Sequence, residues 1–250
     1  MMDHADVATR DLTSLRSLVH IGASAPRSLR LRASRRLGPV ISHAYGASEM
    51  GLVRVLAPAQ YRVSDPNVFA SAGYVRPGVD IRFRRNDGGL VEPGQVGSIE
   101  VRSPAMADGY RNNLALTAEK FHDGWYRSDD LGRLDEQGRL HILGRAADAQ
   151  LSGGRLVMPT DIEDALCGLP SVKYAVAIRD AASKIVIAAL LAWPGMPIRR
   201  AACRQAIARR FGAGIAASLV MVRVDRMPLT EQGKPDRSAI AQLGRTSLAA

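Results

Sequence analysis

Cysteine, lysine and long apolar runs are all scarce in this chain of 250 residues. Its two cysteines, Cys167 and Cys203, are too few for a disulfide framework and lack the spacing of a zinc site. Both fall in helix-like patterns, so we expect them to be small buried apolar side chains.

The longest apolar run, Ile185 to Trp193, has nine residues. A membrane-spanning helix needs about 18, so no membrane span is expected.

A secretory signal is also missing from the first residues, MMDHADVATRDLTSLR. They carry acids where a signal peptide has basic residues and an apolar stretch. This pattern favours a cytoplasmic protein. The composition, with 46% hydrophobic and 23% charged residues, is typical of a globular protein and excludes a disordered tail, a fibre or a coiled coil. A chain of this length can bury one large core or two smaller ones.

Basic residues outnumber acidic ones and give a net charge of +10, which raises the question of nucleic acid. No nucleic-acid motif or run of interleaved aromatics accompanies them. We therefore expect a solvated helix face where arginine is densest, and nucleic-acid binding is the least favoured function. Only four of the 34 basic residues are lysine, so each lysine is informative. The densest arginine group comprises Arg27, Arg30, Arg32, Arg35 and Arg36.

The pattern of apolar segments predicts a mixed α/β and α+β architecture. A strand at 18–21, a helix at 27–37 and a strand at 40–43 indicate the end of an α/β layer within residues 1–65. Residues 66–143 hold short alternating segments between Gly- and Pro-rich turns, which predict a small antiparallel β-barrel-like subdomain. Its expected strands are Val79–Phe83, Ile99–Arg102 and Leu140–Leu143, with a short helix at Thr117–Phe121.

A second, smaller α+β domain is predicted over residues 149–250, after a linker at 144–148. Pro159 suits the first turn of a helix that runs to Cys167. The remaining expected elements are strands Val172–Ile178 and Ile185–Leu191, a basic amphipathic helix Ile198–Phe211, strand Leu219–Val224 and a final helix Asp236–Leu243.

The segment from His43 to Glu49 is the first candidate site, because a glycine turn after a strand presents a hydroxyl and a carboxylate together. Backbone N–H groups and Ser48 suit a phosphate, and Glu49 offers a hard oxygen ligand to Mg²⁺. Tyr45 suits stacking on a base. An ordinary turn with an exposed glutamate is the simpler alternative.

Two further segments carry weaker signals. In Gly124–Leu131, Asp130 in a partly buried turn could accept two hydrogen bonds from a ribose diol, or could be an ordinary turn aspartate between two strands. From Gly144 to Asp148, and then at Gly153-Gly154, glycines allow a backbone to approach a ligand closely. An interdomain linker followed by a hairpin turn is the alternative there.

The fourth segment, Pro228–Arg237, places the rare Lys234 between a glycine and a proline, where it cannot lie inside a helix. Its ammonium group could reach into a cleft as a mobile charge, or could be an ordinary solvated loop lysine.

Taken together and in order, these four segments resemble the core motifs of the adenylate-forming superfamily, closest to fatty or aromatic acid–CoA ligases. Tyr45-Gly46-Ala47-Ser48-Glu49 resembles the family's Tyr-Gly-x-Thr-Glu, and Tyr126 to Leu131 its Tyr-Arg-Thr-Gly-Asp-Leu. Gly144 to Glu163 is similar to the hinge region, and Pro228 to Arg237 to the C-terminal Gly-Lys loop. The 15-residue separation of Asp130 and Arg145 also matches. The resemblance spans residues 15 to 243, and Gly22-Ala23-Ser24-Ala25-Pro26 is similar to the adenine-side loop.

The resemblance implies ATP-dependent activation of a carboxylic acid to an acyl-adenylate and its transfer to coenzyme A. Lys234 would be the catalytic cation, Glu49 the Mg²⁺ ligand, Gly153 part of the coenzyme A path and Gly51 part of the acyl pocket. Asp130 would hold the ribose, with Arg145 beside it. The implied nucleotide-binding set is Ser24, Ala25, Pro26, Tyr45, Gly46, Ala47, Ser48, Asp130, Arg145 and Arg155. Residues 1–143 would be the end of the large domain, 144–148 the hinge and 149–250 the mobile domain.

The chain also departs from the family pattern. The upstream Ser/Thr/Gly-rich phosphate loop is absent, and so is roughly the first half of a typical member. Asp129 replaces a glycine beside the ribose aspartate, and Ala147 replaces the usual Asp or Lys of the hinge. We therefore expect a truncated or split acid–CoA ligase, with a second chain as the candidate source of the N-terminal half. The alternatives are a non-catalytic nucleotide-binding remnant and a peptide-synthetase adenylation domain. The acid and the final thiol acceptor stay open.

Overall fold

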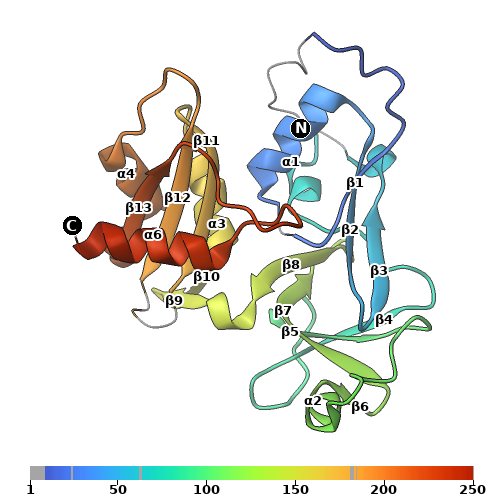
Figure 1. Ribbon diagram of the computed structural model, residues 1–250. Coiled ribbons are helices and arrows are strands. Elements are labelled where there is room, and N and C mark those ends of the chain that lie inside the picture. The colour runs from blue at the N-terminus through green and yellow to red at the C-terminus, as the bar shows by residue number, and fades with distance from the viewer. Residues whose placement is uncertain (1–8, 24, 62–63, 181–182, 184, 250) are drawn as a thin grey trace. The chain divides into compact units, whose positions relative to one another are not determined.

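The computed structural model describes residues 9–23, 25–61, 64–180, 183 and 185–249 (Figure 1). Ser24, predicted to contact adenine, lies outside these residues. The chain divides into two compact units, residues 1–146 and 147–250. The described part contains no helix that is long and apolar enough to cross a membrane.

The first unit begins with the predicted strand–helix–strand pattern. Strand β1 (Leu18–His20), helix α1 (Arg27–Leu37), strand β2 (Ile41–Ala47) and strand β3 (Gly51–Leu56) follow one another. The three strands form one sheet, in which β1 and β2 are parallel and β2 and β3 are antiparallel. The mixed α/β character that we predicted for this region is confirmed.

Strand β2 is longer than predicted, which moves the turn of the first motif. The strand continues through Tyr45, Gly46 and Ala47, and the turn occupies residues 48–50. The expected turn at Gly46 is therefore wrong. A register shift between Tyr45 and Gly46 lets the two strands approach closely, and a Cβ atom at Gly46 would collide with the carbonyl oxygen of Gly51. Glycine is needed at this position for close approach of the backbones.

A five-stranded antiparallel sheet completes the first unit. It is the antiparallel β subdomain that the alternating segments predicted. It has the order β4-β5-β7-β6, with β8 paired to β7, and its core includes Met50, Val53, Ile99 and Val101. The strands are β4 (Asp80–Arg84), β5 (Gly97–Arg102), β6 (Phe121–His122), β7 (Trp125–Leu134) and β8 (Leu140–Arg145). Helix α2 (Leu114–Lys120) lies between β5 and β6 in sequence, and the 3-10 turns η2 (Pro58–Gln60) and η3 (Pro66–Phe69) lie between β3 and β4.

Asp129 and Asp130 lie inside strand β7, not in the turn that the sequence suggested. The ten-residue strand β7 bonds to β5 on one side and to β8 on the other, so its backbone groups are satisfied in extended form despite two adjacent aspartates. Gly144 and Arg145 likewise end strand β8 instead of forming an open linker, and η4 (Ala146–Asp148) spans the boundary between the two units.

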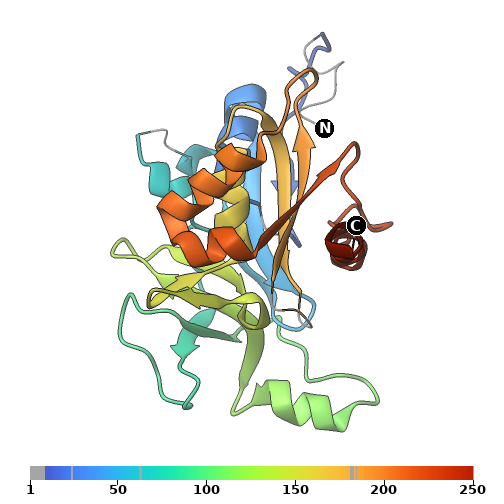
Figure 2. The same ribbon diagram turned by 90° about the vertical axis from the view of Figure 1, so that its left-hand side faces the viewer.

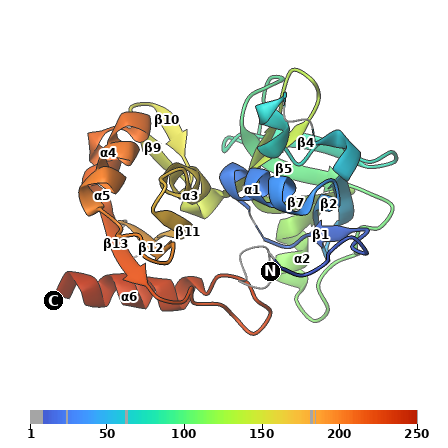
Figure 3. The ribbon, with the colours of Figure 1, turned by 90° about the horizontal axis from the view of Figure 1, so that it is seen from above.

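The second unit is an α+β layer around strand β12. Strands β11, β12 and β13 form a sheet in which β11–β12 is antiparallel and β12–β13 is parallel. Helices α3, α4 and α5 cover one face and α6 covers the other (Figures 2 and 3). The elements are β9 (Gln150–Ser152), β10 (Arg155–Val157), α3 (Pro159–Cys167), β11 (Val172–Arg179), β12 (Val186–Ala192), α4 (Arg200–Phe211), α5 (Ala213–Ser218), β13 (Leu219–Val224) and α6 (Arg237–Ala249).

Alternation along β12 explains why it is apolar throughout. Val186, Ala188 and Leu190 pack in the core under α3 and α4, whereas Ile187 and Ala189 pack against Ile240 of α6. The sequence of a strand that is covered on both faces is a continuous apolar run, and does not alternate between apolar and polar residues. Both cysteines lie on helices as predicted, with Cys203 buried and Cys167 only partly so.

Helix α1 is not the fully solvated arginine face that the sequence suggested. Arg27, Arg35 and Arg36 are exposed, but Arg30 is buried. Its Nη1 donates to the carbonyl oxygen of Ser71 at 2.8 Å. Charge density along the helix did not reveal that one member of the group points inward.

Candidate functional site

Three of the predicted site residues, far apart in sequence, meet in the first unit. Tyr45 lies near the end of β2, Asp130 lies in β7, and Arg145 ends β8 directly opposite Asp130 in the strand register. The Tyr45 hydroxyl donates to Oδ2 of Asp130 at 2.8 Å. Nε of Arg145 lies 3.3 Å from Oδ1 of the same carboxylate. The carboxylate is thus fixed from two sides, in the manner of a preorganised ligand group.

Burial and charge keep the Tyr45 phenol protonated. Burial, and then the adjacent Asp130 carboxylate, raise the pKa of Tyr45 well above its usual value. The protonated phenol donates to Asp130 in this geometry and so helps to orient the carboxylate. Arg145 is more open, with 60% of its side chain exposed, which leaves its guanidinium accessible to a ligand.

The extra acid beside Asp130 is neutralised within the same cluster. Nζ of Lys120, at the end of α2, lies 2.6 Å from Oδ1 of Asp129, and Nη1 of Arg145 lies 3.6 Å from Oδ2. The hydrogen bond to Asp129 raises the pKa of Lys120, which is 14% exposed. The sequence argument missed Lys120 as a site residue, although the rarity of lysine was a usable signal.

Glu49 lies in the turn after β2, within reach of a tyrosine that the sequence did not single out. The hydroxyl of Tyr110 donates to Oε1 of Glu49 at 2.9 Å, and the Tyr110 ring packs edge-on against Phe121. Over the described residues, no group of three or more His, Cys, Asp or Glu side chains could hold a metal ion. Mg²⁺ is commonly held by one or two carboxylates together with phosphate oxygens. Glu49 therefore fits a metal that arrives with a nucleotide, and not a metal site made of protein alone.

The remaining predicted residues of the first unit lie at the turn between β2 and β3 and before α1. Ser48 is exposed in the turn after Ala47. Gly51 has a φ of 68° and packs closely on Ala105. Pro26 directly precedes α1, and its carbonyl oxygen accepts from the backbone of Arg30 at 3.1 Å.

Lys234, Gly153 and Arg155 belong to the second unit. Lys234 is exposed on a tight turn, where the Thr230 N–H donates to the Lys234 carbonyl at 2.7 Å. Within the described part of the chain, its ammonium group has neither an ion-pair nor a hydrogen-bond partner. Gly153 and Gly154, with φ of 55° and 77°, form the open turn of the β9–β10 hairpin. Arg155 is exposed beside the Phe211 ring.

Comparison with known proteins gives a consistent family assignment. The family model described as "AMP-binding enzyme" matches residues 1–111. A medium/long-chain-fatty-acid–CoA ligase, FadD8 of Mycobacterium tuberculosis, is 35% identical over 96% of this chain and 43% of its own length.

Solved structures agree with this sequence match. The amide bond synthetase McbA from Marinactinospora thermotolerans is similar with a TM-score of 0.83 and 29% identity, over 96% of this chain and 50% of that one. The o-succinylbenzoate CoA synthetase MenE from Bacillus subtilis, solved with AMP, has a TM-score of 0.72 and 26% identity over 93% and 48%. The chain spans about half the length of the relatives that it matches.

Proposed function

Because the chain belongs to the AMP-binding superfamily of adenylate-forming enzymes, as a homologue of acyl-CoA ligases, we propose that it takes part in ATP-dependent activation of a carboxylic acid. The acid displaces pyrophosphate from ATP to give an acyl-adenylate, and the acyl group then passes to coenzyme A. The observation that carries this proposal is the convergence of Tyr45 and Arg145 on the carboxylate of Asp130.

In this proposal Asp130 receives the ribose diol of the nucleotide. Its two oxygens are already oriented by the Tyr45 hydroxyl and by Arg145, so little side-chain freedom is lost when the diol binds. The exposed Arg145 guanidinium offers charge to a phosphate beside the ribose. Ser48 and the backbone of Gly46 and Ala47 lie at the same strand end, where a phosphate would meet N–H and hydroxyl donors.

Lys234 supplies the mobile charge for the first step. The attacking carboxylate and the α-phosphate are both anionic, so a cation placed between them stabilises the transition state. An exposed lysine on a tight turn, with no partner of its own among the described residues, can serve this purpose without first breaking an ion pair. The residues 144–148 are the proposed hinge about which the second unit presents Lys234 first and Gly153 afterwards.

Mg²⁺ and coenzyme A complete the proposed reaction. One oxygen of Glu49 would bind the metal together with the nucleotide phosphates, and the metal would shield their charge. Coenzyme A would reach the acyl group past the open Gly153 turn. Fatty or aromatic acids are the proposed substrates, in line with the fatty-acid ligase FadD8 among the relatives.

A second candidate function is nucleotide binding without turnover. It is favoured by one observation, that the chain spans only about half the length of its relatives. A second polypeptide that supplies the other half would restore the first proposal. An adenylation domain that acts on amino acids for a carrier protein is the alternative within the enzymes.

Acid-dependent exchange between ATP and labelled pyrophosphate tests the proposal. The purified chain is assayed with pools of fatty, aromatic and amino acids, and the Lys234→Ala variant serves as the blank. Exchange above the blank with fatty or aromatic acids supports an acid–CoA ligase, and exchange with amino acids alone supports the peptide-synthetase alternative. AMP binding without exchange with any pool would instead support the non-catalytic remnant.

A further inference from the structure

A second charged cluster in the first unit holds two buried arginines and two histidines, and one of its arginines, Arg54, pairs with Tyr45 in the register of strands β2 and β3. It comprises Arg30 of α1, Arg54 of β3, His43 of β2 and His20 of β1. Nδ1 of His20 lies 2.9 Å from Nδ1 of His43, so one ring donates and the other accepts. Burial, Arg30, His20 and Arg54 lower the pKa of His43 to about 3. The histidine pair is therefore neutral at physiological pH, and the two arginines carry the charge.

Among the described residues, Arg54 has no partner for its charge. Its side chain is 0% exposed, and in the described part of the chain Nε, Nη1 and Nη2 all lack a hydrogen bond. The guanidinium fills the space beside Gly73, where a Cβ atom would collide with it. Burial, and then Arg30, lower the pKa of Arg54 to about 9, which still leaves it charged at pH 7. A buried charge without a counter-ion is strongly unfavourable.

Arg30 is held by neutral groups only. Its Nη1 donates to the Ser71 carbonyl, and Nη2 donates to the Tyr61 hydroxyl at 3.1 Å. Its Nε has no partner among the described residues. No ion pair of the described chain joins Arg30 or Arg54 to a carboxylate. The region therefore carries uncompensated positive charge.

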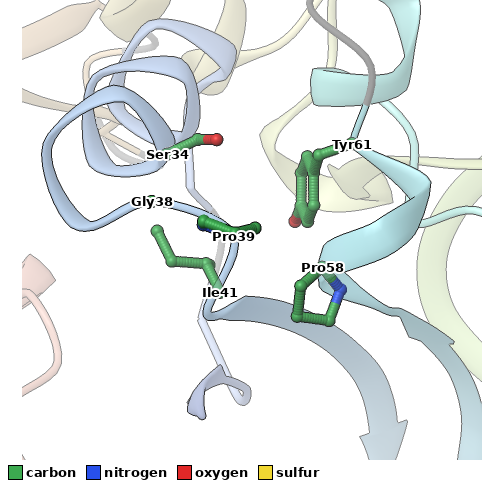
Figure 4. Close-up of a pocket in the computed structure, with 6 residues that line it drawn as sticks. All are labelled: Ser34, Gly38, Pro39, Ile41, Pro58 and Tyr61. Atoms are coloured by element: carbon green, nitrogen blue, oxygen red, sulfur yellow. The ribbon is translucent and has the colours of Figure 1, made fainter. Parts of the chain in front are cut away.

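A cavity of about 180 Å³ opens next to this cluster, between the end of α1 and the Pro58–Tyr61 turn. Figure 4 shows the hydroxyls of Ser34 and Tyr61 directed toward it. Its lining residues are Ser34, Gly38, Pro39, Ile41, Pro58 and Tyr61. Ser34 lies four residues after Arg30 on α1 and so shares its helix face. Because Tyr61 accepts from Arg30, its own hydrogen is free to donate into the cavity, and the first bond strengthens the second.

From the cavity, its two hydroxyls, and two buried arginines that have no carboxylate partner among the described residues and of which Arg30 bonds to the lining residue Tyr61, we propose that the first unit binds a small oxyanion such as phosphate between α1 and the Pro58–Tyr61 turn. The Ser34 and Tyr61 hydroxyls donate to it, and Arg30 and Arg54 supply the charge. The end of a helix carries partial negative charge, so these side chains and not α1 itself must attract the anion. The cavity is smaller than the roughly 300 Å³ at which pockets for drug-sized ligands begin. It therefore suits an inorganic anion better than a nucleotide.

The test is titration of the purified chain with inorganic phosphate, at constant ionic strength set by chloride, followed by calorimetry and by the melting temperature. Sulfate and acetate form separate arms that show which oxyanion is preferred, and AMP is added to ask whether it competes. We expect saturable phosphate binding that raises the melting temperature and that AMP does not displace. Displacement by AMP would assign the phosphate to the nucleotide site and overturn the proposal.

Three variants identify the site. Tyr61→Phe keeps the ring and removes only the hydroxyl, and Arg54→Met removes the buried charge. Each is expected to weaken phosphate binding by about 10-fold or more. Arg35→Met makes the same charge change at an exposed position of α1 and is the control. If phosphate binds equally to wild type, Tyr61→Phe and Arg54→Met, or does not bind to the folded wild type, the proposal is wrong.

Discussion

The first unit contains two charged clusters that treat their charges in opposite ways. Around Asp130 every carboxylate has a cationic partner. Arg145 pairs with Asp130, and both Lys120 and Arg145 pair with Asp129. The Tyr45 hydroxyl also donates to Asp130. Around Arg54, two guanidiniums are buried with neutral partners or with none. The charges of the paired cluster are balanced, which suits a neutral diol as its ligand. The positive charge of the unpaired cluster is not balanced, which suits an anion.

Lys234 has no partner among the described residues either, but it is exposed, so its charge carries no desolvation cost. Its proposed partners are the anionic reactants themselves. The charged groups therefore fall into three kinds. Those around Asp130 are held in ion pairs, the two buried arginines are proposed to receive an anion, and the exposed Lys234 is proposed to meet the substrates.

Removal of the exposed cation is expected to have the largest consequence. Lys234→Ala should lower the rate of acid-dependent ATP–pyrophosphate exchange by about 10²–10³, because a preorganised charge in the transition state contributes about 3–4 kcal/mol. AMP affinity, measured by calorimetry, should barely change. Equal exchange rates in variant and wild type would remove Lys234 from the catalytic role.

A substitution in the paired cluster should weaken AMP binding, in contrast to the effect of Lys234→Ala on the exchange rate. Asp130→Ala should weaken AMP binding by about 1.5–3 kcal/mol, the contribution typical of a hydrogen bond to a charged group. Calorimetry with AMP measures the loss, and Asp225→Ala, at an exposed acid of the second unit, is the control. Unchanged AMP affinity in the Asp130 variant would show that the ribose binds elsewhere.

Removal of the buried unpaired charge should stabilise the protein instead of impairing it. In the absence of phosphate, Arg54→Met should raise the free energy of unfolding by about 1–3 kcal/mol, because an apolar side chain replaces an uncompensated buried cation of similar length. Urea denaturation with and without phosphate measures this effect. A destabilised variant in phosphate-free buffer would mean that Arg54 is compensated in the native state.

Glu163 of α3 shows how a buried group avoids this cost by changing its protonation state. It is buried and accepts from the Ala177 N–H at 2.9 Å, with Arg237, Asp148 and Asp164 as its charged neighbours. Burial raises the pKa of Glu163 from 4.5 to about 8. The folded state thus holds a proton that the unfolded state has lost.

Stability from this group is therefore fully present below pH 4.5 and is lost as the pH rises toward 8. The expected slope is about 1.4 kcal/mol of unfolding free energy per pH unit. Glu163→Gln should remove that slope, as measured by urea denaturation at a series of pH values. A wild-type slope that persists in Glu163→Gln would mean that another group titrates.

The smallest effect concerns the extra acid of the paired cluster. Lys120→Met should weaken AMP binding only a few-fold, because the Lys120–Asp129 pair is partly exposed and such pairs contribute about 0.2–1 kcal/mol. The double variant Lys120→Met/Asp129→Gly should restore wild-type affinity, since it removes the unbalanced charge. A double variant that binds as weakly as Lys120→Met would show that Lys120 acts independently of Asp129.

Much of the fold was readable from the sequence because its apolar periodicities are strong. Helices α1 and α3 and strand β13 begin and end at the predicted residues. The turn at Gly46 and the turn at Asp130 were misplaced, because glycine and aspartate ordinarily signal turns. Here Gly46 instead serves close strand approach, and Asp130 is held in a strand that bonds on both sides.

The site was only partly readable. Motif order selected Tyr45, Asp130 and Arg145, which the structure brings together. The contacts of Lys120 and Tyr110 depend on which strands pair, and no local pattern encodes that. The burial of Arg30 and Arg54 was equally hidden, because an arginine in a helix or strand reads as solvated until the packing around it is known.

The most direct test of the account is a crystal structure of the purified chain with AMP. The account predicts a ribose diol bound to the Asp130 carboxylate, with the Tyr45–Asp130 and Arg145–Asp130 contacts retained. A nucleotide bound elsewhere on the chain, or a ribose that does not touch Asp130, would contradict the assignment of the paired cluster as the nucleotide site.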